Sequence, residues 1–196
     1  MALKVACIVL TRNEEPRIEG CLKHIRPYVD YLLVVDGEST DETVKIAKEY
    51  VDRVEVRPFS GSFAEEKNKA RTLVPKDCEW ILWCDADERL DNGFLRHIKE
   101  NLEYAEKIHQ VCFRFPRVNL PDGRDWPDYQ VRLIKNSRDI EWRGKVHEVP
   151  YFKPEDIPLD ELDQEKRERK LGISTVDGFP ILHLPRREDE RREWWN

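Results

Sequence analysis

Strand-like runs that alternate with helix-like segments constrain the fold more than any other feature of this sequence. The runs are short, contain Val, Ile, Leu or Trp, and occupy residues 4–10, 31–36, 53–58 and 79–85. Runs of that length and composition predict strands, most of them buried. The helix-like segments occupy residues 17–25, 41–50, 62–73 and 92–107. Such alternation predicts an α/β domain with a largely parallel sheet.

Capping residues predict where two of these helices begin. Ser62 stands three residues before Glu65, which is the spacing of a capping box. Thr40 or Asp41 is expected to cap the helix that follows the second strand. Both assignments tie the helices to the turns that end the preceding strands.

The pattern changes after residue 107. Residues 109–118 and 129–135 resemble longer, half-exposed strands, with apolar side chains at every second position. Residues 179–184 resemble a last strand, so we expect a mixed sheet in this half. Residues 153–171 are rich in Pro and charge and predict a flexible or helical excursion, and residues 187–196 predict a peripheral or truncated helix.

Composition excludes some functions and compartments. A net charge of -6 argues against general nucleic-acid binding. The five cysteines include no CxxC spacing and lie largely in apolar runs, as in a reduced cytosolic protein. No run approaches the ~20 apolar residues of a membrane span, and the first residues carry no signal-peptide pattern. We therefore expect a cytoplasmic chain, free or peripheral at the inner face of the membrane. Its oligomeric state is not indicated.

Polar clusters follow three of the predicted strands. They occupy residues 11–15, 36–41 and 85–88. In open α/β sheets, ligands bind at the carboxyl ends of parallel strands, where such clusters would meet. The sequence therefore predicts one polar site at this edge of the sheet.

Asp85 and Asp87 suggest what this edge binds. Close carboxylates repel each other unless a cation lies between them. Mg²⁺ in proteins is commonly shared between one or two carboxylates and substrate phosphates, so this pair could hold a metal on a diphosphate. The alternative is a solvated turn that caps the next helix. Arg89 stands where an EF-hand needs an oxygen ligand and excludes that motif.

Four segments in order resemble glycosyltransferase family 2, which has the GT-A fold. They read CIVLTRNEE, VVDGESTDET, WCDADE and RGKVHE, and are most similar to the branch that includes lipopolysaccharide-core glucosyltransferases. The resemblance implies a Rossmann-like three-layer sandwich with a mixed, mostly parallel central sheet. It also implies a single domain, with a nucleotide-sugar half in residues 1–107 and an acceptor half in residues 108–196.

The resemblance further implies the reaction and its ligands. An inverting, metal-dependent enzyme would move a sugar from a UDP-sugar to a hydroxyl of a glycan, a lipopolysaccharide or a lipid-linked intermediate. The cofactor would be Mn²⁺ or Mg²⁺.

Site residues can be carried over by position. Thr11, Asn13 and Glu14 would form the first nucleotide-binding loop. Asp36 would bind the nucleotide base, which the resemblance implies to be uracil, and Lys67 would approach the nucleotide. Asp85 would contact ribose or metal, and Asp87 would hold the metal. His183 could ligate the metal, touch phosphate or serve only the structure.

The catalytic base is less clear from the sequence, because the Glu-Asp pair usual in this family is missing from the expected place. Inverting transfer needs a carboxylate that takes the proton of the acceptor hydroxyl. Glu148 in RGKVHE is the first candidate, with His147 as a neighbour that could orient it. Asp128 is the second candidate. The alternative for Glu148 is an exposed acid at a strand end.

Basic and aromatic residues of the second half have two interpretations each. Arg132, Arg143 and Lys145 could bind phosphate or an acidic acceptor, or form a solvated face. Trp126 and Trp142 could stack on a sugar or pack in the core. Residues 187–196, with Trp194 and Trp195, could rest on a membrane surface.

Two other functions remain open. A nucleotidyltransferase normally carries a Gly-rich, basic loop early in the chain, which residues 11–16 lack. A non-catalytic nucleotide- or sugar-binding module could keep the same fold, although intact Asp85 and Asp87 speak against it. Residues 113–175 are where we expect acceptor specificity.

Overall fold

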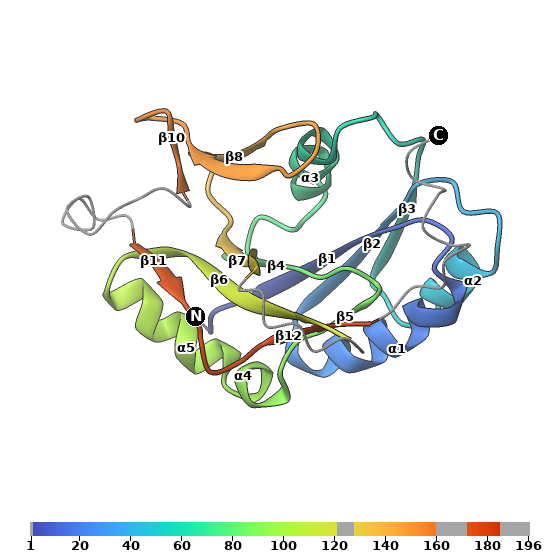
Figure 1. Ribbon diagram of the computed structural model, residues 1–196, viewed down its shortest axis with the longest axis horizontal. Coiled ribbons are helices and arrows are strands. Elements are labelled where there is room, and N and C mark those ends of the chain that lie inside the picture. Colours follow the sequence, from blue (N-terminus) through green and yellow to red (C-terminus); the bar gives the residue numbers. More distant parts are fainter. Residues whose placement is uncertain (1, 121–127, 160–171, 185–196) are drawn as a thin grey trace.

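The first four predicted strands form the parallel part of one large sheet (Figure 1). A computed structural model describes residues 2–120, 128–159 and 172–184. The strands lie in the order β3-β2-β1-β4, with parallel pairing throughout. Their bounds are β1 Val5–Thr11, β2 Tyr31–Asp36, β3 Arg53–Val56 and β4 Trp80–Trp83. The expected parallel core is therefore confirmed.

The second half extends this sheet with mixed pairing. β7 runs antiparallel to β4, β6 antiparallel to β7, and β12 parallel to β6. The short β5 pairs antiparallel with β12, and β11 lies parallel to another part of β6. The bounds are β5 Glu88–Arg89, β6 Gln110–Asn119, β7 Asp128–Lys135, β11 Gly172–Thr175 and β12 Ile181–His183. The predicted change to a mixed sheet is confirmed.

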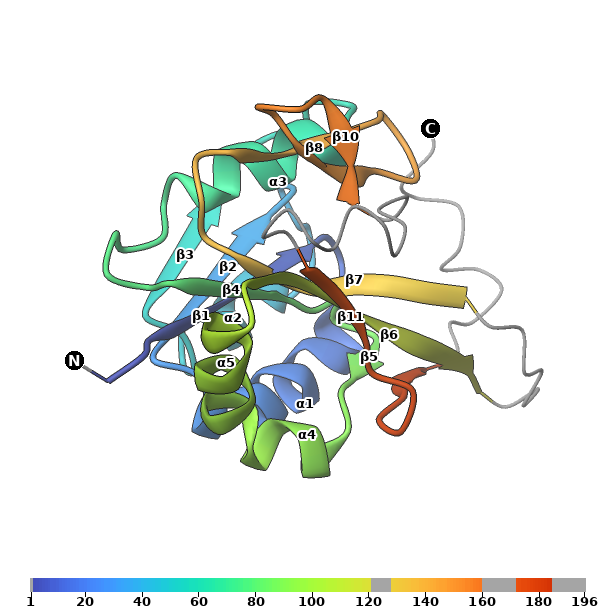
Figure 2. The same cartoon turned by 90° about the vertical axis from the view of Figure 1, so that its left-hand side faces the viewer.

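A small antiparallel sheet, absent from the sequence-based expectation, lies over one face of the large one (Figure 2). It contains β8 Ile140–Arg143, β9 Val149–Phe152 and β10 Ile157–Pro158. The segment RGKVHE forms the connection between β8 and β9, and Gly144 there has φ +102°, a backbone angle that favours glycine.

Helices cover both faces of the large sheet and make it the middle of three layers. Figures 1 and 2 show α1, α4 and α5 on one face, and α3 with the small sheet on the other. The helices are α1 Glu15–Ile25, α2 Thr43–Ala47, α3 Phe63–Arg71, α4 Asn92–Arg96 and α5 Ile98–Lys107, and a 3-10 turn covers Arg26–Tyr28. Among these residues, no helix is both long and apolar enough to traverse a membrane.

The alternation of strand side chains divides the core between these two faces. Trp80 and Leu82 of β4 pack with α1 and α5, whereas Ile81 and Trp83 pack on the side of α3. Successive strand residues point to opposite faces, so this division follows directly from the sequence. As a result, the Trp83 ring lies on the face of the sheet that α3 covers.

Two helix assignments need correction. The helix predicted over residues 41–50 covers only Thr43–Ala47 and begins after Glu42. Asp41 Oδ1 accepts from the backbone N–H and the hydroxyl of Thr43, the first helical residue, as a capping side chain does. The helix predicted over 92–107 is divided at His97, whose backbone leaves helical geometry. The Ser62 cap is confirmed: its hydroxyl accepts from the backbone N–H of Glu65 at 3.3 Å.

Candidate functional site

The loops after β1 and β2 interlock at the carboxyl edge of the sheet. Thr11 and Asp36, the last residues of the two strands, are in register with each other. The backbone N–H of Asn13 donates to the Ser39 hydroxyl at 2.8 Å, and the Asn13 side-chain oxygen accepts from the backbone N–H of Thr40 at 2.8 Å. The two predicted polar clusters thus do meet.

Asp36 organises the second of these loops. Its carboxylate is fully buried and accepts from the backbone N–H of Ser39 at 2.7 Å and from the Ser39 hydroxyl at 2.5 Å. A cavity of about 20 Å³ adjoins it. The cavity is lined by Leu10, Thr11, Val35, Asp36, Gly37, Arg57, Phe59, Phe63 and Glu66. The Thr11 hydroxyl is buried and has no partner within the described part of the chain.

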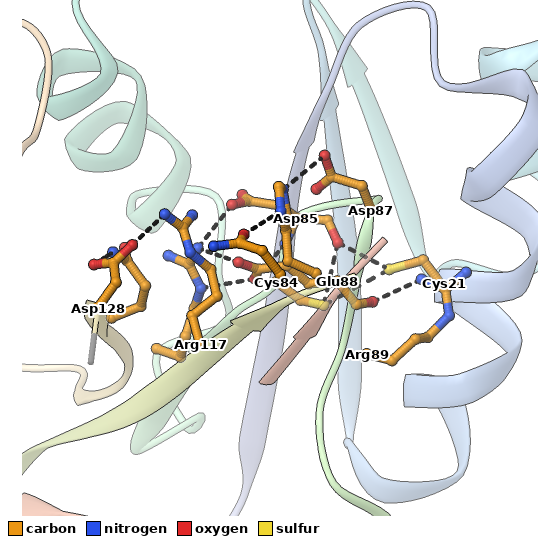
Figure 3. A network of polar contacts seen from close by, with 12 residues as sticks. Cys21, Cys84, Asp85, Asp87, Glu88, Arg89, Arg117 and Asp128 are labelled. Atoms are coloured by element: carbon orange, nitrogen blue, oxygen red, sulfur yellow. Dashed lines mark hydrogen bonds and ion pairs between the residues drawn. The ribbon is translucent and has the colours of Figure 1, made fainter. Parts of the chain in front are cut away.

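The acidic turn after β4 is held by Arg132 of β7. Arg132 donates from Nε and Nη2 to the two carboxylate oxygens of Glu88, at 2.8 and 2.6 Å, and from Nη2 to Asp85 at 2.8 Å. Glu88 and Arg132 are buried, whereas the Asp85 side chain is 46% exposed. Figure 3 shows Asp85, Asp87 and Glu88 gathered between the Arg117–Asp128 pair and Cys21. Arg132 therefore offsets part of the negative charge of the turn, and its bonds to Glu88 and Asp85 engage it within the protein.

Burial and charge act against each other within this network. Burial raises the pKa of Glu88, with the charges of Asp85 and Asp87 adding to the effect and Arg132 opposing it. Burial also disfavours the charge on Arg132, but Asp85 and Glu88 outweigh it and raise the pKa of Arg132. The guanidinium is thus a permanent cation behind the acidic turn.

Asp87 lies beside His183 on the other side of the turn. The Asp87 Oδ2 is 3.3 Å from His183 Nε2, and His183 Nδ1 is 2.9 Å from the side-chain oxygen of Asn119. This contact exists because β12 pairs with β5, which places His183 opposite Glu88. An amide oxygen can only accept, so we assign the proton to Nδ1. Nε2 faces the Asp87 carboxylate, and it could ligate a metal only as an unprotonated nitrogen, with the metal in place of this direct contact.

The expected metal set of Asp85, Asp87 and His183 is only partly brought together. Asp85 turns to Arg132, and no cluster of three metal-binding side chains occurs in the residues that the structure describes. A carboxylate and an imidazole nitrogen are nevertheless suitable donors for Mn²⁺. A metal of this class commonly completes its shell with phosphate oxygens and water. Asp87 and His183 therefore fit as the two protein ligands of such a metal.

Lys67 of α3 and Glu148 of the β8–β9 connection form a second charged pair. The Lys67 ammonium is 2.7 Å from Glu148 Oε1, and only 6% of the Lys67 side chain is exposed. It lies 3.9 Å from the centre of the Trp142 ring and 5.2 Å from that of Trp83. Trp142 is itself buried and packs edge-on against Trp83, as the core interpretation expected.

The pKa values of Lys67 and Glu148 are both lowered, for different reasons. Burial lowers the pKa of Lys67 below 10.5, although Glu148 opposes this. Burial alone would raise the pKa of Glu148, but the charge and hydrogen bond of Lys67 outweigh it and hold that pKa below 4.5. Glu148 is therefore an ionised carboxylate at neutral pH.

A cavity of about 660 Å³ lies beside Asp85 and the Lys67–Glu148 pair, whereas Asp87 and His183 are not among its lining residues. Predicted site residues in its lining are Glu14, Lys67, Asp85, Asp128 and Glu148. Leu10 and Phe63 line both this cavity and the small one beside Asp36, so the two spaces adjoin. The lining also includes Arg114, Arg117, Arg132 and His147.

Asp128 is more constrained than Glu148. It forms an ion pair with Arg117 and accepts from the Gln130 side chain at 2.7 Å, so both of its oxygens are engaged. Glu148 has its charge balanced by one ammonium and presents 17% of its side chain to solvent. Geometry thus favours Glu148 over Asp128 as a proton acceptor in the cavity.

Two arginines in the lining were missed by sequence reasoning. Arg114 donates from Nε to the Thr175 hydroxyl at 2.8 Å and lies over the Tyr129 ring, while Arg117 pairs with Asp128. Arg114 stands between Phe113 and Phe115, and that alternation could have placed it on the cavity face. Arg143, by contrast, is engaged by Glu141 and Asp156, and Lys145 is exposed. Trp126, Trp194 and Trp195 lie outside the described residues.

Comparison with known proteins gives a consistent family. Residues 6–159 match the model described as Glycosyl transferase family 2. An uncharacterized glycosyltransferase of Rickettsia felis is 36% identical over 106 residues, which cover 54% of this chain and 35% of that protein. The glycosyltransferase SunS of Bacillus phage SPbeta is 27% identical over 165 residues, covering 80% and 37%. The chain thus spans about a third of the length of these curated relatives.

Solved structures share the fold. Glucosyl-3-phosphoglycerate synthase of Mycobacterium tuberculosis, in complex with Mn²⁺, UDP and glucosyl-3-phosphoglycerate, has a TM-score of 0.60 at 16% identity, covering 96% of this chain and 74% of that one. TarS of S. aureus, residues 1–349, has a TM-score of 0.58 at 15% identity, covering 93% and 60%. These likenesses confirm the mixed, mostly parallel GT-A sandwich. The lipopolysaccharide-core branch stays a prediction.

Proposed function

This chain belongs to glycosyltransferase family 2, and from that premise we propose that it transfers a sugar from a UDP-sugar to a hydroxyl acceptor, with inversion at the anomeric carbon and with a divalent metal. The observation that carries the proposal is the cavity of about 660 Å³, which gathers Asp85, Lys67 and Glu148 where the parallel strands end. A cleft with a few convergent polar groups at this edge is where α/β folds bind ligands.

The donor would lie on the interlocked loops after β1 and β2. We assign the nucleotide to Thr11, Asn13, Glu14 and Asp36, with the base near the tilted Phe59–Phe63 ring pair. The buried Thr11 hydroxyl, which lacks a partner in the described chain, supports a ligand there. The choice of UDP is supported by the synthase structures, which hold UDP or UDP-glucose with Mn²⁺.

Asp87 and His183 would hold the metal, Mn²⁺ or Mg²⁺. When bound, the metal offsets the negative charge that grows on the departing diphosphate. Asp85 would contact ribose or metal from its exposed position, oriented by Arg132. The buried Arg132 cation offsets part of the negative charge with which this turn would repel an anionic donor.

Glu148 would act as the general base. It takes the proton of the acceptor hydroxyl as the acceptor oxygen bonds to the anomeric carbon and the bond from that carbon to the diphosphate oxygen breaks. Attack from the face opposite the diphosphate inverts the configuration. Asp128 is the second candidate for this role.

The acceptor would enter through the second half of the chain. We assign residues 1–107 to the nucleotide-sugar and residues 108–196 to the acceptor, because Arg114, Arg117 and Asp128 of the second half line the same cavity. A glycan, a lipopolysaccharide or a lipid-linked intermediate presents the required hydroxyl.

The proposed compartment is the cytoplasm. All five cysteines are buried free thiols, as expected in a reducing environment. Peripheral contact with the inner face of the membrane would involve residues 187–196, which lie outside the described residues.

The test is a panel of UDP-sugars and acceptor glycans with Mn²⁺, Mg²⁺ or EDTA. We expect metal-dependent release of UDP, and a glycosylated product whose new anomeric configuration, read by NMR, is opposite to that of the donor. Metal-independent UDP binding without turnover of any donor would contradict the proposal and favour a binding module.

A further inference from the structure

We propose that Lys67 is a positioning residue for the base, holding Glu148 Oε1 so that the carboxylate keeps one charge state and one orientation in the cavity. This inference rests on the proposed function and departs from the sequence expectation, in which Lys67 approaches the nucleotide. It assigns the ammonium to the base and not to the diphosphate.

The environment of Lys67 suits a fixed partner. Its ammonium is buried beside the Trp142 and Trp83 rings and lies 2.7 Å from Glu148 Oε1. Taking an ammonium out of water is costly unless a counter-charge and aromatic faces replace the solvent, and all of these are present here. Aromatic walls on this side also restrict the movement of the side chain.

Hydrogen bonds connect the backbone segments that carry Lys67 and Glu148. Asn68, next to Lys67 on α3, accepts from the backbone N–H of Trp142 at 2.9 Å and donates to the Trp142 carbonyl at 2.7 Å. The backbone N–H of Phe63 donates to the carbonyl of Lys145 at 3.1 Å. These bonds tie α3 to β8 and to the connection that carries Glu148, so the pair is set by the fold.

Charged groups of two other elements, α3 and β7, act on Glu148. Lys67 approaches from α3 and Arg132 acts from β7, and both favour the ionised carboxylate. Asp85 acts on Lys67 and helps to keep it charged. Burial acts in the opposite direction and is the largest single influence on Glu148. Removing the Lys67 charge therefore moves the pKa of Glu148 upward, toward protonation at a pH where the native enzyme is ionised.

The experiment measures kcat against pH, and the KM for the donor, in Lys67→Met and Lys67→Arg. With Lys67→Met we expect a roughly tenfold loss of kcat at the acidic end, recovery to within about threefold on the alkaline plateau, and an unchanged donor KM. Lys67→Arg keeps the positive charge, so kcat should fall at the same low pH as in the native enzyme; we call this fall the acid limb of the pH–rate profile. Lys135→Met is the matched control, because Lys135 forms the same kind of pair with Glu106 outside the cavity lining.

An NMR titration makes the test independent of activity, and its measurement on the native protein does not depend on the stability of Lys67→Met. Protein labelled with ¹³C at the glutamate carboxyls, assigned with Glu148→Gln, should show Glu148 titrating below an ordinary glutamate in the native protein and higher in Lys67→Met.

An unmoved acid limb together with a donor KM raised tenfold would overturn the inference and assign Lys67 to the nucleotide. A native Glu148 that titrates above an ordinary glutamate would also overturn it. Failure of the proposed function is a different result, in which the native protein turns over no UDP-sugar at all.

Discussion

Arg132 of β7 and Glu88 of the acidic turn form a buried pair joined by two hydrogen bonds, at 2.8 and 2.6 Å. The pair connects the antiparallel half of the sheet to the turn that carries Asp85 and Asp87. The geometry of the acidic turn, where we propose that the metal binds, therefore depends on β7, a strand that comes later in the chain.

Breaking this pair should destabilise the fold. Arg132→Met leaves Glu88 as an uncompensated buried acid, and we expect a loss of about 3–5 kcal/mol in the free energy of unfolding. Glu88→Gln in the same chain removes that charge and should restore part of the loss. Urea unfolding of the two single variants and the double variant measures the coupling. Additive losses in the double variant would contradict the pair as the cause.

Asp87 should be required for metal-dependent donor binding, whereas the fold should not need it. Asp87→Ala is expected to abolish the effect of Mn²⁺ on UDP affinity, and His183→Ala to weaken it, because each removes one proposed ligand. Isothermal titration of UDP with and without Mn²⁺ provides the measurement. Asp77→Ala removes an exposed acid paired with Lys4 and serves as the control. Native Mn²⁺ dependence in Asp87→Ala would reject the metal role.

Substitution of the two candidate general bases, Glu148 and Asp128, should lower kcat by clearly different factors. Glu148→Gln is expected to lower kcat by about 10²–10⁴-fold, the usual contribution of general base catalysis, with UDP affinity unchanged. Asp128→Asn should cost less than about tenfold, because Arg117 and Gln130 already engage its carboxylate. The reverse order of losses would transfer the base to Asp128.

The acid limb of the native enzyme should lie low on the pH scale. Lys67 holds the folded pKa of Glu148 below that of an ordinary glutamate, so the carboxylate is ionised at neutral pH and loses its charge only as pH falls through the folded pKa. We expect kcat to stay constant from neutral pH down to about pH 5. Measurement of kcat over this range checks the prediction, and a limb near pH 6.5 would contradict it.

Asp36 should support the nucleotide loop. Asp36→Ala removes the acceptor of two hydrogen bonds from Ser39, whose hydroxyl in turn accepts from the backbone of Asn13. We expect UDP affinity to fall about tenfold, equivalent to losing about 1.4 kcal/mol of binding free energy. Titration with UDP measures this. Unchanged affinity in a folded variant would move the nucleotide away from this loop.

Local patterns in the sequence predicted much of the fold. The apolar runs identified β1, β2 and β4, and the Ser62–Glu65 spacing identified the start of α3, because strand burial and helix capping depend on neighbours close in sequence. Thr40 and Asp41 were poorer guides to the helix start, since Thr40 bonds to Asn13 of the neighbouring loop and Asp41 accepts from both Thr43 and Glu15.

Contacts between distant segments could not be read in the same way. Nothing local indicates that Lys67 meets Glu148 or that His183 lies opposite Glu88, since both contacts depend on how α3, β12 and the small sheet pack. Arg132 illustrates the same limit, because its residue type suggested anion binding while its burial against Glu88 assigns it an internal role. Residue type indicated the chemistry of the site, and only tertiary packing indicated the partners.

The most direct test of the account is an anomalous difference map from crystals grown with UDP and Mn²⁺, recorded at the manganese edge. The account predicts one strong peak within coordination distance of the Asp87 carboxylate. The diphosphate of UDP should lie on the side of the peak away from Asp87, and the uracil ring should lie beside Asp36. A peak elsewhere, or a nucleotide bound away from the acidic turn, would contradict it.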